Sequence, residues 1–149
     1  MKLLSGMALF ILCALIGEGR ARRLQRRERT LTGLGRLIRE IGQRQQRTLL
    51  SFREAALLSP PSPEREQLLS LAAGAKDALP LLTAEERSSL MAYARSETAS
   101  LDALRREREA LLGLLEKARE SARAELAQKG RVYRSVGYLC GAAALLLVL

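Results

Sequence analysis

The stretch RARRLQRRERTLTGLGRLIREIGQRQQR, residues Arg20–Arg47, decides how the chain is organised. It holds ten arginines and two acidic residues, so its formal charge of +8 nearly equals the +9 of the whole chain. An apolar run, Leu3–Gly17, comes directly before it. A dense cationic block beside a hydrophobic segment resists transfer across a membrane and stays on the cytoplasmic side. We therefore expect an N-terminal transmembrane anchor at residues 1–19, followed by a cytoplasmic body.

The C-terminal end repeats this order in reverse. Basic residues precede Val136–Leu149, which contains no charge, and this predicts a second transmembrane anchor at residues 136–149. Tyr133 stands at the expected crossing point, where its mixed character suits the headgroup layer. Gly137 and Gly141 lie four residues apart, a spacing that allows close helix–helix contact in a membrane, although it is also met among ordinary helix glycines.

Nine basic residues flank the two expected anchors, and we name them the basic collar. They are expected to fix the topology by staying at the cytoplasmic membrane surface. Two interpretations fit the arginines near the membrane equally well. They either form a solvated helix face or are attracted to anionic lipid headgroups. The members of the basic collar are Arg20, Arg22, Arg23, Arg26, Arg27, Arg29, Lys129, Arg131 and Arg134.

Residues 20–135 between the anchors show helical periodicity. Apolar residues recur at steps of three and four from Leu31 to Ile41, and again from Leu101 to Leu126. Two amphipathic helices that pack antiparallel are therefore expected. Because aromatic residues make up only 3% of the chain, Leu and Ala must supply the core. The sequence predicts an all-α fold, a cytoplasmic helical bundle or antiparallel hairpin flanked by N- and C-terminal transmembrane helices.

The middle of the body predicts shorter helices. The helix that begins near Leu24 should continue past Phe52 and end at the proline-rich linker 59–63, because proline cannot stay in a helix interior. Pro63 then suits the first position of a helix reaching about Leu79. Thr83 and the glutamate three residues later form a capping-box pattern, which predicts a further helix to about Arg95. A weak break is expected at residues 96–100.

Composition argues against several functional classes. The chain has no histidine, and its two cysteines, Cys13 and Cys140, lie in the apolar ends. No phosphate-binding glycine loop is present. We therefore expect no enzyme, no cofactor and no metal site. Residues 48–135 are nearly neutral and contain few aromatic residues, which argues against a nucleic-acid partner. For Arg36–Arg47, contact with an acidic protein partner stays open.

The stretch KGRVYRSVGYLCG, Lys129–Gly141, followed by aliphatic residues, resembles the ending of the stage III sporulation protein AB family. The N-terminal end agrees through its Lys-Leu-Leu start, its Gly-Glu pair and Leu-Ile-Arg-Glu-Ile at Leu37–Ile41. Phe52–Ala55 falls where members often carry a Leu-x-Glu-Ala segment. The similarity follows the whole chain in order and is strongest at the two ends.

This resemblance implies a non-enzymatic membrane scaffold of a channel-like, secretion-like complex between mother cell and forespore. The soluble domain of the family is similar to the platform protein of type II secretion. The expected partners are the membrane, a stage III sporulation protein AA-type cytoplasmic ATPase and other channel components. The expected location is the bacterial cell membrane, on the mother-cell side around the forespore, with the soluble domain in the cytoplasm. A homo-oligomer stays open.

Two other functions also stay open from the residues alone. The first is a membrane-surface lipid-binding or membrane-shaping protein that acts through its basic juxtamembrane helix. The second is an exported protein with a C-terminal anchor, whose N-terminal segment is a cleaved signal peptide, because Gly17-Glu18-Gly19 fits a small-x-small cleavage site. The location of the helical body separates the second from the rest.

Overall fold

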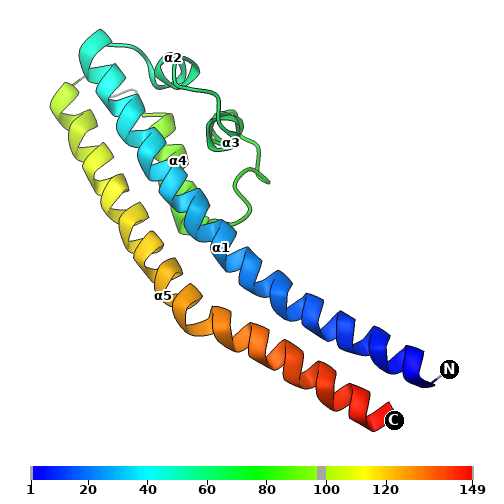
Figure 1. Cartoon of the computed structure of the whole chain (residues 1–149). Coiled ribbons are helices and arrows are strands. Elements are labelled where there is room, and N and C mark those ends of the chain that lie inside the picture. The colour runs from blue at the N-terminus through cyan, green and yellow to red at the C-terminus, as the bar shows by residue number, and fades with distance from the viewer. Residues whose placement is uncertain (1, 97–99, 149) are drawn as a thin grey trace. The chain divides into compact units, whose positions relative to one another are not determined.

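The chain is all-helical in its computed structural model, which describes residues 2–96 and 100–148, with side chains over 5–96 and 100–146. Helix accounts for 84% of these residues and no strand is present among them, so the predicted all-α class is confirmed. The helices are α1 (Lys2–Thr48), α2 (Phe52–Leu57), α3 (Pro63–Ala72), α4 (Ala84–Ala94) and α5 (Leu101–Val148) (Figure 1).

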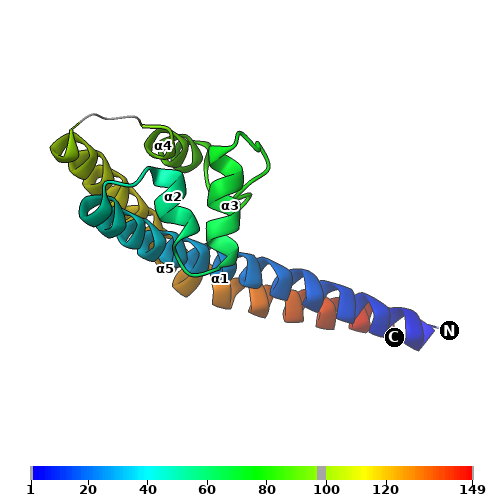
Figure 2. The ribbon, with the colours of Figure 1, turned by 90° about the horizontal axis from the view of Figure 1, so that it is seen from above.

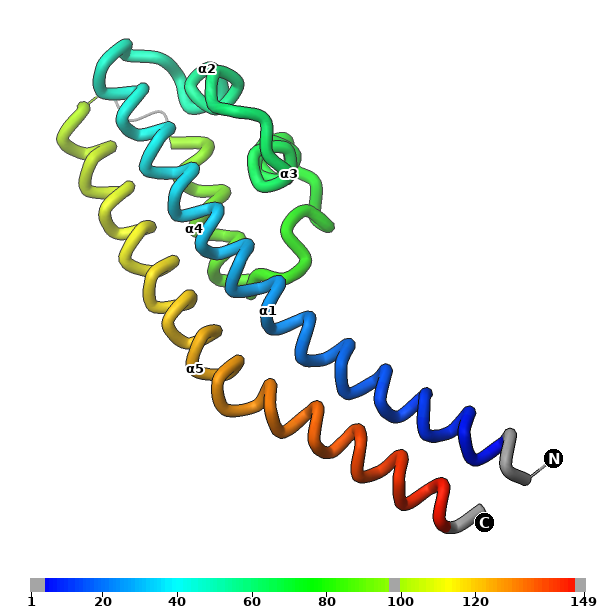
Figure 3. Tube along the Cα trace, viewed as in Figure 1, coloured from blue at the N-terminus to red at the C-terminus, as the bar shows by residue number. Residues whose placement is uncertain are grey.

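Two compact units divide the chain. Unit 1 combines Met1–Glu28 with Glu120–Leu149, and unit 2 is Arg29–Arg119. The long helices α1 and α5 each contribute one segment to both units. Within unit 1 these two segments run side by side in opposite directions (Figure 3).

Helix α1 continues without a break through the expected boundary between anchor and body. Its apolar run Leu3–Gly17 rises about 22 Å, which is less than the roughly 30 Å hydrocarbon core of a bilayer. Over the described residues, no helix offers a stretch that is both long and apolar enough to span a membrane. The transmembrane anchors expected at residues 1–19 and 136–149 are not supported by the helices themselves and stay a prediction.

The core of unit 2 forms around one stripe of α1. Leu31, Leu34, Ile38 and Ile41 are each at most 1% exposed, as their spacing predicted. Fully burying such a side chain stabilises the fold by about 1.5–3 kcal/mol. Helices α2, α3 and α4 gather on one side of this part of α1 (Figure 2) and add further leucines. The leucines that they and α5 bury most deeply are Leu68, Leu71, Leu90 and Leu115.

The antiparallel pairing of α1 and α5 in unit 2 is also confirmed. Arg39 of α1 faces Glu116 of α5, and the two side chains approach to 3.9 Å. Farther along α1, Gly42 lies under the guanidinium group of Arg108, which comes earlier in α5. Arg108 interrupts the apolar stripe of α5. The missing side chain at Gly42 therefore leaves the space that this arginine occupies.

The predicted end of the first helix was wrong. Helix α1 ends at Thr48, and Leu49 adopts a left-handed backbone with φ 54°. Ser51 then caps α2: its Oγ accepts a hydrogen bond from the Glu54 amide, and its own amide donates to Glu54 Oε2 at 3.0 Å. The Ser51 hydroxyl, together with this amide, holds the pKa of Glu54 below its ordinary value. The Ser51-x-x-Glu54 signal was present in the sequence and was overlooked.

The predicted end of the third helix was wrong as well, because α3 ends at Ala72 and not near Leu79. Gly74 takes a left-handed backbone with φ 99° and forms a Schellman C-cap, in which the Ala75 amide donates to the Ser70 carbonyl at 3.0 Å. The predicted helix starts at Pro63 and after Thr83 are confirmed. The break expected at residues 96–100 falls mainly on 97–99, which lie outside the described residues.

A buried hydrogen bond joins the elements of unit 2. The Tyr93 hydroxyl in α4 donates to Gln45 Oε1 in α1 at 3.1 Å, and both residues are at most 5% exposed. The Tyr93 ring also meets Phe52 of α2 edge to face, with centroids 5.7 Å apart. Burial raises the pKa of the Tyr93 hydroxyl to about 12. Gln45 interrupts the apolar stripe of α1, and the Tyr93 hydroxyl supplies a hydrogen bond to its buried side-chain oxygen.

We expect Tyr93→Phe to lower the free energy of unfolding by about 1–2 kcal/mol, because the Gln45 acceptor stays buried without its donor. Urea unfolding of the full chain followed by circular dichroism measures this change. Tyr138→Phe is the matched control, since Tyr138 is 50% exposed. An equal effect of the two substitutions would contradict the role given to the hydrogen bond.

The same variant has a pH signature. Tyr93 has a higher pKa in the folded chain than in the unfolded chain, so its contribution to stability is complete below pH 10 and is lost as the pH rises towards 12. Between pH 10 and about 12, the free energy of unfolding of Tyr93→Phe should therefore fall less than that of the natural chain.

Candidate functional site

The contact between α1 and α5 in unit 1 is made by the smallest side chains. Among the residues of unit 1 whose side chains are described, every buried one is glycine or alanine. Small residues at a helix–helix contact allow the two backbones to approach closely. These residues, which we name the small-residue seam, are Gly6, Gly17, Ala21, Ala122, Gly130, Gly137 and Gly141.

Three glycines of this seam lie against backbone atoms of the opposite helix, whereas the nearest atoms to Gly130 belong to the Leu126 side chain of its own helix. A Cβ atom added to Gly17 would lie 2.5 Å from the carbonyl oxygen of Tyr133 and 3.2 Å from the Cα of Gly137. A Cβ atom added to Gly137 would lie 3.0 Å from the carbonyl oxygen of Cys13. At Gly141 the same atom would lie 3.0 Å from the carbonyl oxygen of Phe10. Since these contacts are with main-chain atoms, a larger side chain at any of the three must push the helices apart.

The structure thus places Gly137 and Gly141 against α1 of the same chain. Gly17 completes this contact from the other side, and sequence reasoning did not single it out. A signal was available, because Cys13, Gly17 and Ala21 repeat a small residue every four positions. That repeat is the same small-xxx-small spacing that drew attention to the C-terminal glycines.

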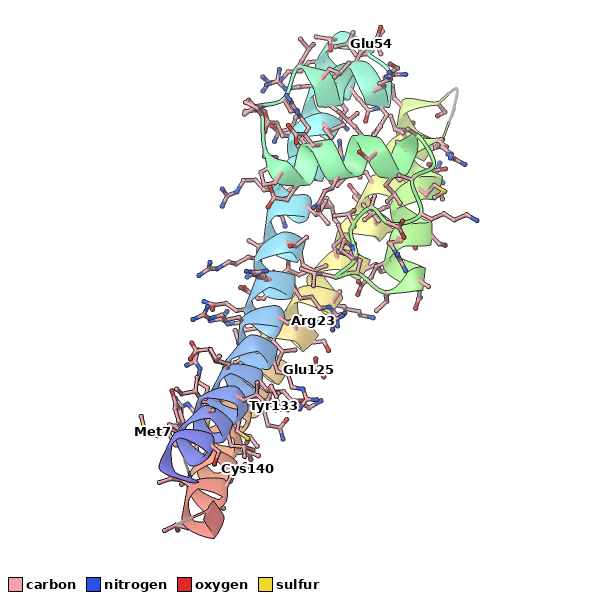
Figure 4. The ribbon with its side chains drawn as sticks, turned by 90° about the vertical axis from the view of Figure 1, so that its right-hand side faces the viewer. Met7, Arg23, Glu54, Glu125, Tyr133 and Cys140 are labelled. Atoms are coloured by element: carbon pink, nitrogen blue, oxygen red, sulfur yellow. The ribbon has the colours of Figure 1, made fainter. Side chains whose placement is uncertain are left out.

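Large apolar side chains cover the outside of the pair. Eleven of them in unit 1 are between 44% and 73% exposed. Figure 4 shows one, Met7, projecting away from both helices. In a water-soluble antiparallel pair the large residues fill the seam and polar residues face outward. Unit 1 has the reverse pattern. The outward residues are Met7, Leu9, Ile11, Leu12, Leu15, Ile16, Val132, Val136, Tyr138, Leu139 and Leu146.

The basic collar lies mostly at the surface. Arg27 is half-buried, while the other eight members of the collar are exposed. Tyr133, which lies between Arg131 and Arg134 in the sequence, is half-buried as well. Arg29 belongs to unit 2, and the remaining members come from both helices of unit 1. Figure 4 shows Arg23 of α1 and Tyr133 of α5 in this region.

Arg22 and Lys129 of the collar pair with acidic neighbours in their own helices. Arg22 lies 3.3 Å from Glu18, and Lys129 lies 2.8 Å from Glu125. The hydrogen bond and the charge of the partner lower the pKa of Glu125 and raise the pKa of Lys129. The side chains of Arg22 and Lys129 are exposed, so these ion pairs orient the long basic side chains more than they stabilise the fold.

The site therefore offers an apolar exterior bordered by cations. Over the part of the chain with described side chains, no group of three or more potential ligands is placed to hold a metal ion. Comparison of the chain with protein-family models, with curated proteins and with solved structures finds no match.

We expect Gly17→Leu to separate α1 from α5, because the new side chain would meet the Tyr133 backbone. Gly19→Leu is the matched control, since a Cβ atom there meets nothing within 4 Å. Nitroxide labels at positions 12 and 139, in a chain whose two cysteines are alanine, report the distance by electron paramagnetic resonance. Gly17→Leu should lengthen it by about 2 Å, the range over which helix separations vary, and Gly19→Leu should not. Equal distances in the two variants would refute the close seam.

Proposed function

We propose that unit 1 is a hairpin embedded in a bacterial cell membrane by both chain ends. The observation that carries this proposal is the reversed distribution of side chains, with glycine and alanine inside the pair and large apolar residues outside. In lipid the exposed apolar side chains carry no unfavourable hydration free energy, and close packing of small residues holds the two helices together. Because the apolar segments are short, local thinning of the bilayer and outward reach of the collar arginines would match their length.

The basic collar supports a cytoplasmic location for unit 2. Exposed arginines and lysines next to apolar segments favour the cytoplasmic side, and both helices of unit 1 supply them. Residues 1–19 and 136–149 would then act as the two anchors. The described part of unit 2, with its leucine core and capped short helices, forms the body that the anchors hold at the membrane surface.

We further propose that this body is a non-enzymatic scaffold that docks a cytoplasmic ATPase. The resemblance of the two chain ends to the stage III sporulation protein AB family supports this role. It favours a channel-like complex between mother cell and forespore, and an ATPase of the stage III sporulation protein AA type as the partner. A helical body tethered by both ends suits an adaptor between such an ATPase and the membrane components of the complex.

A second candidate function is binding or shaping of an anionic membrane surface through the collar. It is favoured by the exposure of Arg20, Arg23 and Arg26, for which no ion pair is found among the described residues. Each cationic group near an anionic surface gains about 1 kcal/mol. Under this function, membrane binding alone suffices and no ATPase is needed.

The cytoplasmic location predicts that Ser88→Cys is protected from a membrane-impermeant maleimide in intact cells and reacts after permeabilisation. Ser88 is exposed in α4 and caps no helix, unlike Ser62, which accepts a hydrogen bond from Arg65. The two natural cysteines are replaced by alanine for this measurement. Labelling of Ser88→Cys in intact cells would place unit 2 outside and contradict the proposal.

The scaffold function predicts that the ATPase purifies with the full chain when both are expressed together in membranes. A chain in which Arg20, Arg23 and Arg26 are changed to glutamine should keep the ATPase, because these residues belong to unit 1. Failure of the natural chain to retain the ATPase, while it still fractionates with membranes, would favour the second candidate and reject the scaffold.

A further inference from the structure

A small groove in unit 2 combines basic side chains with a gap in the surface. It lies between α1 and α5, and its volume is about 180 Å³. Arg36 and Arg39 of α1 line it on one side, and Arg119 of α5 lines it on the other. Leu31, Leu112 and Leu115 supply its apolar lining. All of these residues belong to unit 2.

Positive charge is in excess in this groove. Glu116 is the only acidic residue among the lining residues, and its two carboxylate oxygens lie 3.2 Å from Arg119 and 3.9 Å from Arg39. Glu116 therefore holds two guanidinium groups at the groove while neutralising one charge. The side chain of Arg36 is exposed and, over the described residues, forms no ion pair or hydrogen bond. The groove thus keeps guanidinium donors that face solvent and are available to a partner.

Gly35 opens the groove between these arginines. A Cβ atom added there would meet no atom within 4 Å, so nothing inside the described chain requires a glycine. Glycine inside a helix costs about 1 kcal/mol relative to alanine. Gly33, two residues earlier, is different, because a Cβ atom there would meet the Glu64 side chain at 2.9 Å. Gly35 therefore leaves room beside the arginines for a group from outside the chain.

We propose that this groove docks an acidic helical segment of a partner protein, with a carboxylate side chain seated between Arg36, Arg39 and Arg119. A guanidinium group binds a carboxylate through two parallel hydrogen bonds, which suits this set of donors. Leu112, the partly exposed leucine of the lining, suits the apolar residue that neighbours such a carboxylate on an amphipathic helix. No aromatic residue lines the groove, so it offers no surface on which a nucleic-acid base could stack.

The inference rests on the proposed scaffold function only for the identity of the partner, which would be the ATPase. The site itself is tested with a fluorescein-labelled helical peptide that carries glutamate and leucine every fourth residue. A second peptide with glutamine in place of glutamate serves as the reference. Fluorescence anisotropy with the full chain in neutral detergent, at 0.15 M salt, should show at least about tenfold tighter binding of the glutamate peptide.

Two glycine variants separate the groove from general charge attraction. Gly35→Leu should weaken binding of the glutamate peptide about tenfold by filling the groove, without changing the charge of the chain. Gly113→Leu is the matched control, because Gly113 is exposed in α5, has no atom within 4 Å of an added Cβ and does not line the groove. Circular dichroism should show that both variants keep their helix content.

Charge variants complete the test. Changing Arg36, Arg39 and Arg119 to glutamine should abolish the preference for glutamate, whereas changing Arg53, Arg105 and Arg106, which do not line the groove, should preserve it. Equal losses in these two triple variants would overturn the proposal, as would equal effects of Gly35→Leu and Gly113→Leu. Equally tight binding of a single-stranded oligonucleotide would overturn the assignment to a protein partner. Loss of ATPase copurification with peptide binding intact would reject the scaffold function and leave the groove standing.

Discussion

Direct contact between the backbones of α1 and α5 is the constraint on which unit 1 depends. At Gly17 and Gly137 the helices approach so closely that one added carbon atom would fall 3.2 Å from a Cα atom across the seam. Such an approach requires that no side chain stand between the helices. It also leaves the large apolar residues of both helices no place except the outer surface, where eleven of them are found. The reversed surface of unit 1 is therefore a consequence of its small-residue seam.

The same two helices follow the opposite packing rule in unit 2. There, the leucines Leu31 and Leu115 are buried where α1 and α5 meet, while arginines and glutamates are found at the surface. Burial of large apolar side chains is what water favours, whereas close contact of small residues is what an apolar solvent favours. We propose that this change of packing rule along α1 and α5 reflects a change of solvent along them, from water around unit 2 to lipid around unit 1.

Sequence reasoning predicted the parts of the fold that depend on local signals. The apolar stripe of α1, the proline start of α3 and the capping box of α4 are each set by a few neighbouring residues, and all three were correct. The helix ends at Leu49 and Gly74 were missed. A left-handed backbone at a leucine has no reliable signal, whereas Gly74 is a common helix-ending residue whose signal was outweighed by the apolar residues that continue to Leu79. The partner of the C-terminal glycines, Gly17, depends on how two distant segments align. The groove at Gly35 depends in the same way on residues that lie far apart in the sequence.

The central claim is that the outer face of unit 1 contacts lipid, and collision measurements on nitroxide labels test it most directly. Single labels at positions 12, 15 and 139 of the full chain in bilayers, in a background without other cysteines, can be compared with a label at Ser88, which is exposed in unit 2. The account predicts frequent collisions with oxygen and few with a water-soluble nickel chelate at the three positions of unit 1, and the reverse at Ser88. Frequent collisions with the nickel chelate at all four positions would show that unit 1 lies in water and would contradict the account.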